Sequence, residues 1–123
     1  MLSLVPDAPV RLTGSAGGIH APDTFLRWSQ QAPTRDLVRF DARDRDELEL
    51  RTLLPHAREI AHPYVAYLGS EEKSFLVNAR KASTDARTAG KRFDVVEVPG
   101  DHMAALEPAL DAFLRRVEAD AAR

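Results

Sequence analysis

The chain has no cysteine among its 123 residues, so it can form neither a disulfide framework nor a thiolate metal site. It also lacks a basic excess: 17 Lys and Arg stand against 19 Asp and Glu, for a formal net charge of −2. Binding to a phosphate backbone needs clustered positive charge, so we expect no nucleic-acid partner. No uninterrupted run of about 18 apolar residues occurs, and we therefore expect no membrane partner.

The first residues, 1–6, have neither the basic start nor the apolar length of a secretory signal peptide, which favours a cytoplasmic protein. Hydrophobic residues make up 44% of the chain, and its length suits one domain that buries a core without disulfides or a structural metal. The composition thus indicates one globular domain.

The pattern changes near Pro63, which divides the chain into residues 1–62 and 63–123. In the first part, residues 10–13 are the best strand candidate, and the glycines that follow are expected to end it. A short helix is predicted from Pro22, closed by Pro33, and residues 34–52 read as a surface excursion with one or two helical turns.

In the second part, residues 64–68 form a continuous β-prone run, typical of a strand buried on both faces. A helix is predicted over 73–89 with Gly90 as its C-terminal cap, followed by a strand over 93–98. The last helix is expected to be amphipathic, with an apolar face formed by Leu106, Leu110, Phe113, Leu114 and Val117.

This alternation of strands and helices predicts an α/β fold with about three parallel strands and helices packed on the sheet. In such a sheet the loops that follow the strands meet at the carboxyl edge, where sites form. The loop 69–72 and the loop 100–102 should therefore be neighbours. His102 would project into the crevice, and a carboxylate from Glu71 or Glu72 could accept its Nδ1 proton, which is half of a Ser-His-acid site.

Two segments resemble the last third of an α/β-hydrolase. Tyr-Val-Ala-Tyr-Leu-Gly-Ser-Glu-Glu, residues 64–72, is similar to the strand and loop that carry the catalytic acid, and Val-Glu-Val-Pro-Gly-Asp-His, residues 96–102, resembles the loop with the catalytic His. The family's Gly-x-x-Asp pattern maps onto residues 69–72 and selects Glu72. Residues 10–28 look like the sixth strand and the cap-like excursion after it, nearest the prolyl-oligopeptidase and dienelactone-hydrolase branch. The resemblance implies a serine hydrolase of esterase or peptidase type.

No Gly-x-Ser-x-Gly elbow is present, however. The nearest match, residues 13–17, has Thr in place of the first Gly, and the residues after Ser15 oppose the helix that an elbow must enter. Ser15 remains the candidate nucleophile because Ser15, Glu72 and His102 follow the family's chain order. We expect a truncated or split hydrolase, inactive alone, whose ester, amide or peptide substrate requires a nucleophile-bearing half.

The alternative is a non-catalytic interaction module: without the strands that carry the nucleophile, the sheet has an unpaired edge that could pair with a second copy or an N-terminal-half partner. We expect no cofactor and no metal, since His56, Glu59 and His62 are not spaced as a zinc pair. His20 could line the crevice or be solvated. Trp28 with Phe25 could form an apolar substrate wall or anchor a helix.

Overall fold

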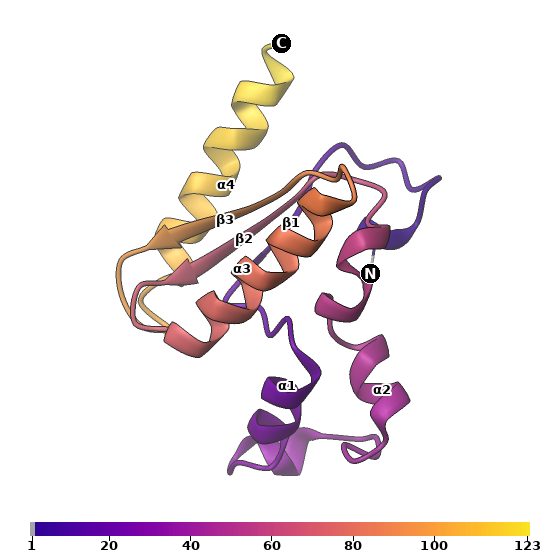
Figure 1. Ribbon diagram of the computed structural model, residues 1–123. Helices are drawn as coiled ribbons and strands as arrows, with labels where there is room; N and C mark the ends of the chain where they lie inside the picture. Colours follow the sequence, from indigo (N-terminus) through magenta and orange to yellow (C-terminus); the bar gives the residue numbers. More distant parts are fainter. Residues whose placement is uncertain (1) are drawn as a thin grey trace.

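Three parallel strands form the central sheet of the computed structural model, which describes residues 2–123 (Figure 1). They are β1 (Thr13–Ala16), β2 (Tyr64–Gly69) and β3 (Phe93–Val98), in the order β1-β2-β3. Thr13 pairs with Tyr64 at the start of β2, which in turn pairs with Phe93. The protein therefore has the expected α/β fold, and both parts of the chain contribute to one sheet.

Helices cover both faces of this sheet (Figure 1). The 3-10 helix η3 (Leu54–Glu59) and helix α3 (Lys73–Thr88) pack on one face, and helix α4 (Leu106–Ala121) packs on the other. Side chains along β2 alternate accordingly: Ala66 and Leu68 join the first core, whereas Val65 and Tyr67 join the second. All of β2 is buried, as its continuous apolar run predicts.

Helix α4 contacts the sheet through a different face from the one that the sequence pattern predicts. Small residues make the contact, because short side chains let the helix approach the strands; they are Ala105, Ala109 and Ala112, joined by Phe113. Four of the five residues of the predicted apolar face are instead exposed: Leu106 at 54%, Leu110 at 56%, Leu114 at 52% and Val117 at 41%. The prediction was wrong about which stripe of α4 is buried.

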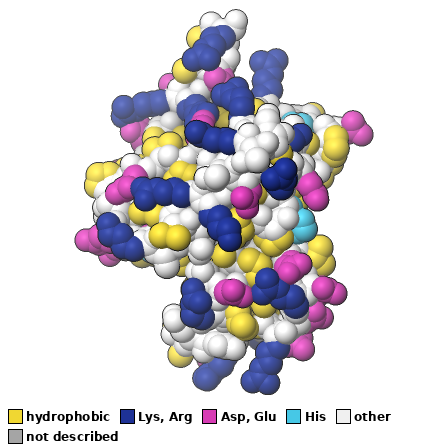
Figure 2. Space-filling view, in the orientation of Figure 1, with side chains coloured by type: hydrophobic (Ala, Val, Ile, Leu, Met, Phe, Trp, Pro, Cys, Tyr) yellow, Lys and Arg dark blue, Asp and Glu magenta, His cyan; other side chains and the backbone are white. Residues whose placement is uncertain are grey.

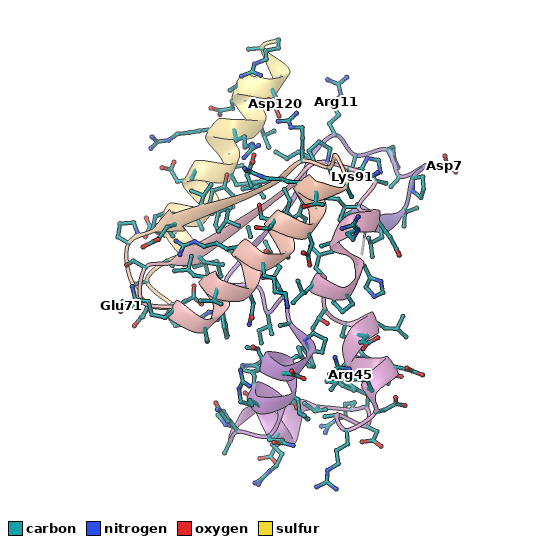
Figure 3. The ribbon with its side chains drawn as sticks, in the orientation of Figure 1. Asp7, Arg11, Arg45, Glu71, Lys91 and Asp120 are labelled. Atoms are coloured by element: carbon teal, nitrogen blue, oxygen red, sulfur yellow. The ribbon has the colours of Figure 1, made fainter. Side chains whose placement is uncertain are left out.

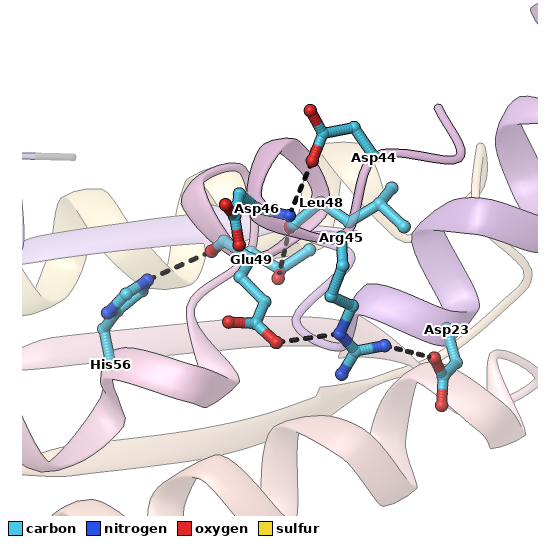
Figure 4. A network of polar contacts seen from close by, with 8 residues as sticks. Asp23, Asp44, Arg45, Asp46, Leu48, Glu49 and His56 are labelled. Carbon is cyan, nitrogen blue, oxygen red and sulfur yellow. Dashed lines mark hydrogen bonds and ion pairs between the residues drawn. The ribbon is translucent and has the colours of Figure 1, made fainter. Parts of the chain in front are cut away.

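The segment between β1 and β2 forms a small lobe beneath the sheet in Figure 1. It contains α1 (Pro22–Ser29), a 3-10 helix η2 (Thr34–Leu37) and α2 (Arg45–Leu50). The Arg45 guanidinium donates to Asp23 on α1 at 2.9 Å and to Glu49 at 2.7 Å, and so joins the two helices (Figure 4). The expected excursion with short helical pieces is confirmed.

The element boundaries match the predictions in the second part of the chain better than in the first. The predicted strand at 10–13 was misplaced: β1 begins at Thr13 and includes the residues that were expected to end it. Pairing with Tyr64 explains the shift, since the hydrogen bonds of β2 select the segment that pairs. In the second part, β2, α3 and β3 lie where predicted, and Gly90 has the positive φ, 75°, of a C-terminal cap.

The chain has no predominant charge on the face drawn in Figure 2, where basic and acidic side chains alternate around apolar ones. A short 3-10 helix, η1 (Leu2–Leu4), starts the described part. None of the helices in residues 2–123 combines the length and the apolar character that a membrane span requires.

Candidate active site at the carboxyl edge of the sheet

The loops after β2 and β3 are hydrogen-bonded to each other along their length. The Ser70 amide donates to the Val98 carbonyl at 2.8 Å, and the Glu71 amide donates to the Gly100 carbonyl at 3.1 Å. The Gly100 amide in turn donates to the Ser70 hydroxyl at 3.2 Å. Parallel pairing brings both loops to one edge, and these bonds fix their relative position. Side chains on the two loops are therefore held at a defined separation.

Glu72 and His102 meet across these two loops. The His102 Nδ1 lies 2.6 Å from Glu72 Oε1, and the other carboxylate oxygen, Oε2, accepts the Gly69 amide at 2.6 Å. The Glu72 side chain is only 6% exposed, whereas that of His102 is 58% exposed. An ionised carboxylate can only accept, so Nδ1 carries the proton and the lone pair of the neutral ring is on Nε2. The arrangement orients an accessible base.

The neighbouring carboxylates do not compete for His102. Asp101 accepts the amides of Met103 at 3.1 Å and Ala104 at 2.9 Å, and thereby fixes the turn that leads into α4. Glu71 is exposed, and Figure 3 shows its side chain at the outer tip of the loop, pointing away from the rest of the chain. Of the two glutamates that the sequence leaves open, the structure brings only Glu72 to His102.

Gly17 packs directly against the His102 ring. Its amide extends the pairing of β1 by donating to the Tyr67 carbonyl at 2.9 Å, and its φ is 62°. A Cβ at this position would lie 2.6 Å from Cε1 and 2.7 Å from Nδ1 of His102. Only glycine combines this backbone conformation with such close packing. Gly17 therefore sets the position of the imidazole from the β1 side.

A cleft of about 500 Å³ opens beside the His102 ring. Trp28 on α1 and Phe75 at the start of α3 supply its aromatic surface. The remaining lining residues come from the loops after the three strands and from the beginning of α3: Gly17, Ile19, Glu71, Glu72, Lys73, Ser74, Asp101 and His102. Trp28 thus lies on the cleft as the sequence suggested, whereas Phe25 packs behind it, 5.5 Å from the Trp28 ring.

Comparisons with protein-family models, with curated proteins and with solved structures found no match to this chain. The case for a function therefore rests on the geometry of the cleft and its residues.

Ser15 lies inside β1 rather than at a turn into a helix. Its hydroxyl accepts a hydrogen bond from the Tyr64 hydroxyl at 2.7 Å. Within residues 2–123, no serine hydroxyl is hydrogen-bonded to His102. The structure therefore brings two of the three candidate catalytic residues together, and a nucleophilic role for Ser15 stays a prediction.

His20 is buried beside Ser15 and Tyr64, with only 2% of its surface exposed. It was predicted either to line the crevice or to be solvated, and it does neither. Its Nε2 lies 3.4 Å from the Tyr64 hydroxyl, and its ring packs against Tyr64 and Phe93. Burial lowers the pKa of His20 to about 4, an effect that the nearby Gly18 backbone partly opposes. Burial also raises the pKa of Tyr64, although the Ser15 contact opposes the shift. His20 is thus a neutral core residue.

The other two histidines, His56 and His62, make contacts to backbone carbonyls. His56 Nε2 bonds to the Glu49 carbonyl at 3.1 Å, and His62 Nε2 bonds to the Val5 carbonyl at 2.8 Å. His56 Nδ1 lies 3.9 Å from the Glu59 carboxylate. In the described part of the chain, no three side chains of His, Asp or Glu are grouped as metal ligands.

Sequence reasoning missed Gly17, Phe75, Lys73 and Ser74 as parts of the site. Phe75 packs against the core on one face of the sheet, and its ring also approaches His102 edge-on, at 6.3 Å between ring centroids. The signal for Gly17 was available: it stands just after a strand whose carboxyl end must lie near the loop of His102.

Proposed function

We propose that this chain supplies the histidine and the acid of a serine-hydrolase site, and that a polypeptide segment other than residues 1–123 supplies the nucleophile. The observation that carries the proposal is the 2.6 Å contact between His102 Nδ1 and a nearly buried Glu72 carboxylate. The resemblance of residues 63–102 to an α/β-hydrolase, of the prolyl-oligopeptidase and dienelactone-hydrolase branch, supports it. A cytoplasmic location is part of the proposal.

In this proposal His102 acts first as a base and then as an acid. Its Nε2 takes the proton of a serine hydroxyl as the serine oxygen attacks the carbonyl carbon of an ester or amide. The proton then passes from Nε2 to the departing alcohol or amine, which leaves an acyl-serine. Water repeats the sequence and releases the acid. Glu72 holds the ring in the required tautomer and stabilises the imidazolium that forms in each step.

The chain alone is expected to lack two parts of this chemistry. Ser15 is engaged by Tyr64, and the proposal assigns no backbone amides of residues 2–123 to an oxyanion. Without covalent capture and oxyanion stabilisation, an oriented imidazole is a weak catalyst on its own. The chain should therefore react slowly with activated esters and not turn over ordinary ones.

The test combines a fluorophosphonate serine probe with p-nitrophenyl acetate, applied to the folded chain. We expect no serine to be labelled, because within the described residues no serine hydroxyl is hydrogen-bonded to His102. We also expect slow p-nitrophenol release that falls on the order of tenfold in His102→Gln, less than the roughly 100-fold that a positioned base contributes in a complete site. His62→Gln removes an imidazole outside the cleft and should leave the rate unchanged.

Two outcomes would contradict the proposal in different ways. Labelling of Ser15 or Ser74 that is lost in His102→Gln would mean that the chain is a complete hydrolase with an unusual nucleophile. Release of p-nitrophenol at the same rate in His102→Gln and in the unsubstituted chain would mean that His102 is not a base here. Circular dichroism of each variant confirms that the fold is intact.

A second candidate function, a non-catalytic interaction module, is favoured by the exposed side of α4 and β1. β1 is hydrogen-bonded to β2 on one side only, which leaves the other edge unpaired in the described chain. Beside this edge is a groove of about 230 Å³, lined by Gly14, Ala16, Leu106 and Leu110 among others. A strand edge next to an apolar helix stripe is a typical surface for pairing with another polypeptide.

If this surface pairs two copies of the chain, the mass measured by sedimentation equilibrium should rise with concentration. Leu110→Glu places a charge in the groove and should weaken self-association by on the order of tenfold or more, because it buries an unpaired carboxylate. Leu50→Glu changes a leucine on α2 that is 72% exposed and serves as the matched control. A monomer at every concentration, or an equal effect of both variants, would count against the module.

A further inference from the structure

The open surface of the cleft beside His102 is mainly apolar. Trp28 and Phe75 face it from two different helices, and Ile19 adds an aliphatic contact. The carboxylates of Glu72 and Asp101 also line it, but both already accept hydrogen bonds from the chain. The exposed side chains of Glu71, Lys73 and Ser74 complete the lining. An entering molecule therefore meets two aromatic rings and an exposed imidazole, with these polar groups beside them.

A series of packed side chains supports the Trp28 ring. Phe25 lies 5.5 Å from Trp28, Phe40 stacks on Phe25 at 5.9 Å, and the Arg51 guanidinium lies 3.8 Å from the centre of the Phe40 ring. Although its ring is supported in this way, Trp28 remains 39% exposed. A large ring that is held in place and left partly uncovered beside a base is suited to contact a ligand.

Phe75 supplies the second aromatic ring of the cleft. Its ring stands edge-on to His102, at 6.3 Å and 84°, so that it borders the imidazole without covering it. A group between Trp28 and Phe75 would therefore lie next to the base. The volume of about 500 Å³ is within the range of small-molecule sites and leaves room for a ring and the bond to be cleaved.

We propose that the ester or amide substrate of this site carries an aryl group that packs between Trp28 and Phe75, next to His102. The inference rests on the proposed function and adds the substrate class to it. Aromatic pairs gain from edge and face geometry beyond the area they bury, so an aryl group should bind about threefold to tenfold more tightly than an alkyl group of similar size.

The test measures binding rather than turnover, with amides as probes. Trp28 is the only tryptophan of the chain, so its fluorescence reports the cleft directly. N-benzylacetamide is titrated against N-hexylacetamide and acetamide, with calorimetry as a second readout. We expect N-benzylacetamide to shift the emission of Trp28 and to bind about threefold to tenfold more tightly than N-hexylacetamide. Acetamide should show no saturable binding to the cleft.

Phe75→Leu keeps an apolar side chain and removes the ring. It should weaken N-benzylacetamide binding by about threefold to tenfold and change N-hexylacetamide binding much less. Val77→Ala is the matched control, because Val77 is on the same helix, is 65% exposed and does not line the cleft. A further measurement needs no variant. In NMR spectra of the unsubstituted chain, N-benzylacetamide should shift the resonances of the Trp28 indole N–H and the His102 ring.

Equal affinity for the benzyl and hexyl amides, no saturation by either, or resonance shifts away from Trp28 and His102 would each overturn the inference. These results are separable from the test of the proposed function, since the amide probes need no nucleophile. Aryl-selective binding together with ester cleavage that does not depend on His102 would keep the aryl site and remove the hydrolase. The reverse result would keep the base and remove the aryl preference.

Discussion

Gly17→Ala should separate His102 from Glu72 and abolish the part of p-nitrophenyl acetate cleavage that depends on His102. The added methyl group would lie 2.6 Å from Cε1 of His102, and the exposed ring gives way more easily than the strand. Once the ring moves, the 2.6 Å contact with Glu72 is lost and the tautomer is no longer fixed. The rate should fall on the order of tenfold, to that of His102→Gln, while the fold is kept.

Gly90→Ala is the control for backbone strain in this experiment. Gly90 also has a positive φ, 75°, but a Cβ there would meet no atom within 4 Å. Both substitutions should cost roughly 1–2 kcal/mol of stability because both place a side chain in the left-handed region. Only Gly17→Ala should alter ester cleavage. Equal rates in the two variants would show that Gly17 does not position the ring.

Acid should destabilise the protein through His20. Burial lowers the pKa of His20 to about 4 from an ordinary value of 6.5, so the unfolded chain binds this proton more readily than the folded one. The resulting stability is fully present above about pH 6.5 and is lost as the pH falls toward about 4. A shift of this size corresponds to roughly 3 kcal/mol. Urea unfolding at several pH values between 7.5 and 4 measures it.

His20→Phe keeps a ring between Tyr64 and Phe93 and removes the titrating group. The loss of stability between pH 6.5 and 4 should then be smaller by about 3 kcal/mol than in the unsubstituted chain. His62→Gln removes an imidazole outside the core and serves as the control. An unchanged pH profile in His20→Phe would mean that His20 does not stay neutral in the fold.

The second part of the chain was predictable because each of its signals has one physical meaning. A continuous apolar run ended by Gly69 leaves few alternatives to a buried strand, and Gly90 marks the end of a helix by its conformation. The separation of Glu72 and His102 by one helix and one strand then follows from parallel pairing. The shared edge was therefore predictable, together with two of the residues at it.

The errors come from features that depend on the tertiary structure. The strand in the first part was misplaced because its position is set by hydrogen bonds to β2, which lies far away in the sequence. In α4, Ala109 approaches the sheet while Leu110 remains exposed, because close packing favours the smaller side chain over the more hydrophobic one. No local pattern shows that His20, in a loop, is covered on every side.

The hydrogen bonds between the loops after β2 and β3 also have a mechanical consequence. Ser70 is joined to Val98 and Gly100, so Glu72 and His102 belong to one rigid body that includes the strand ends. Trp28 lies on α1, which is joined to α3 by the hydrogen bond from the Asn78 side-chain amide to the Thr24 hydroxyl at 2.7 Å. The chain itself therefore fixes the orientation of the base before any ligand enters the cleft.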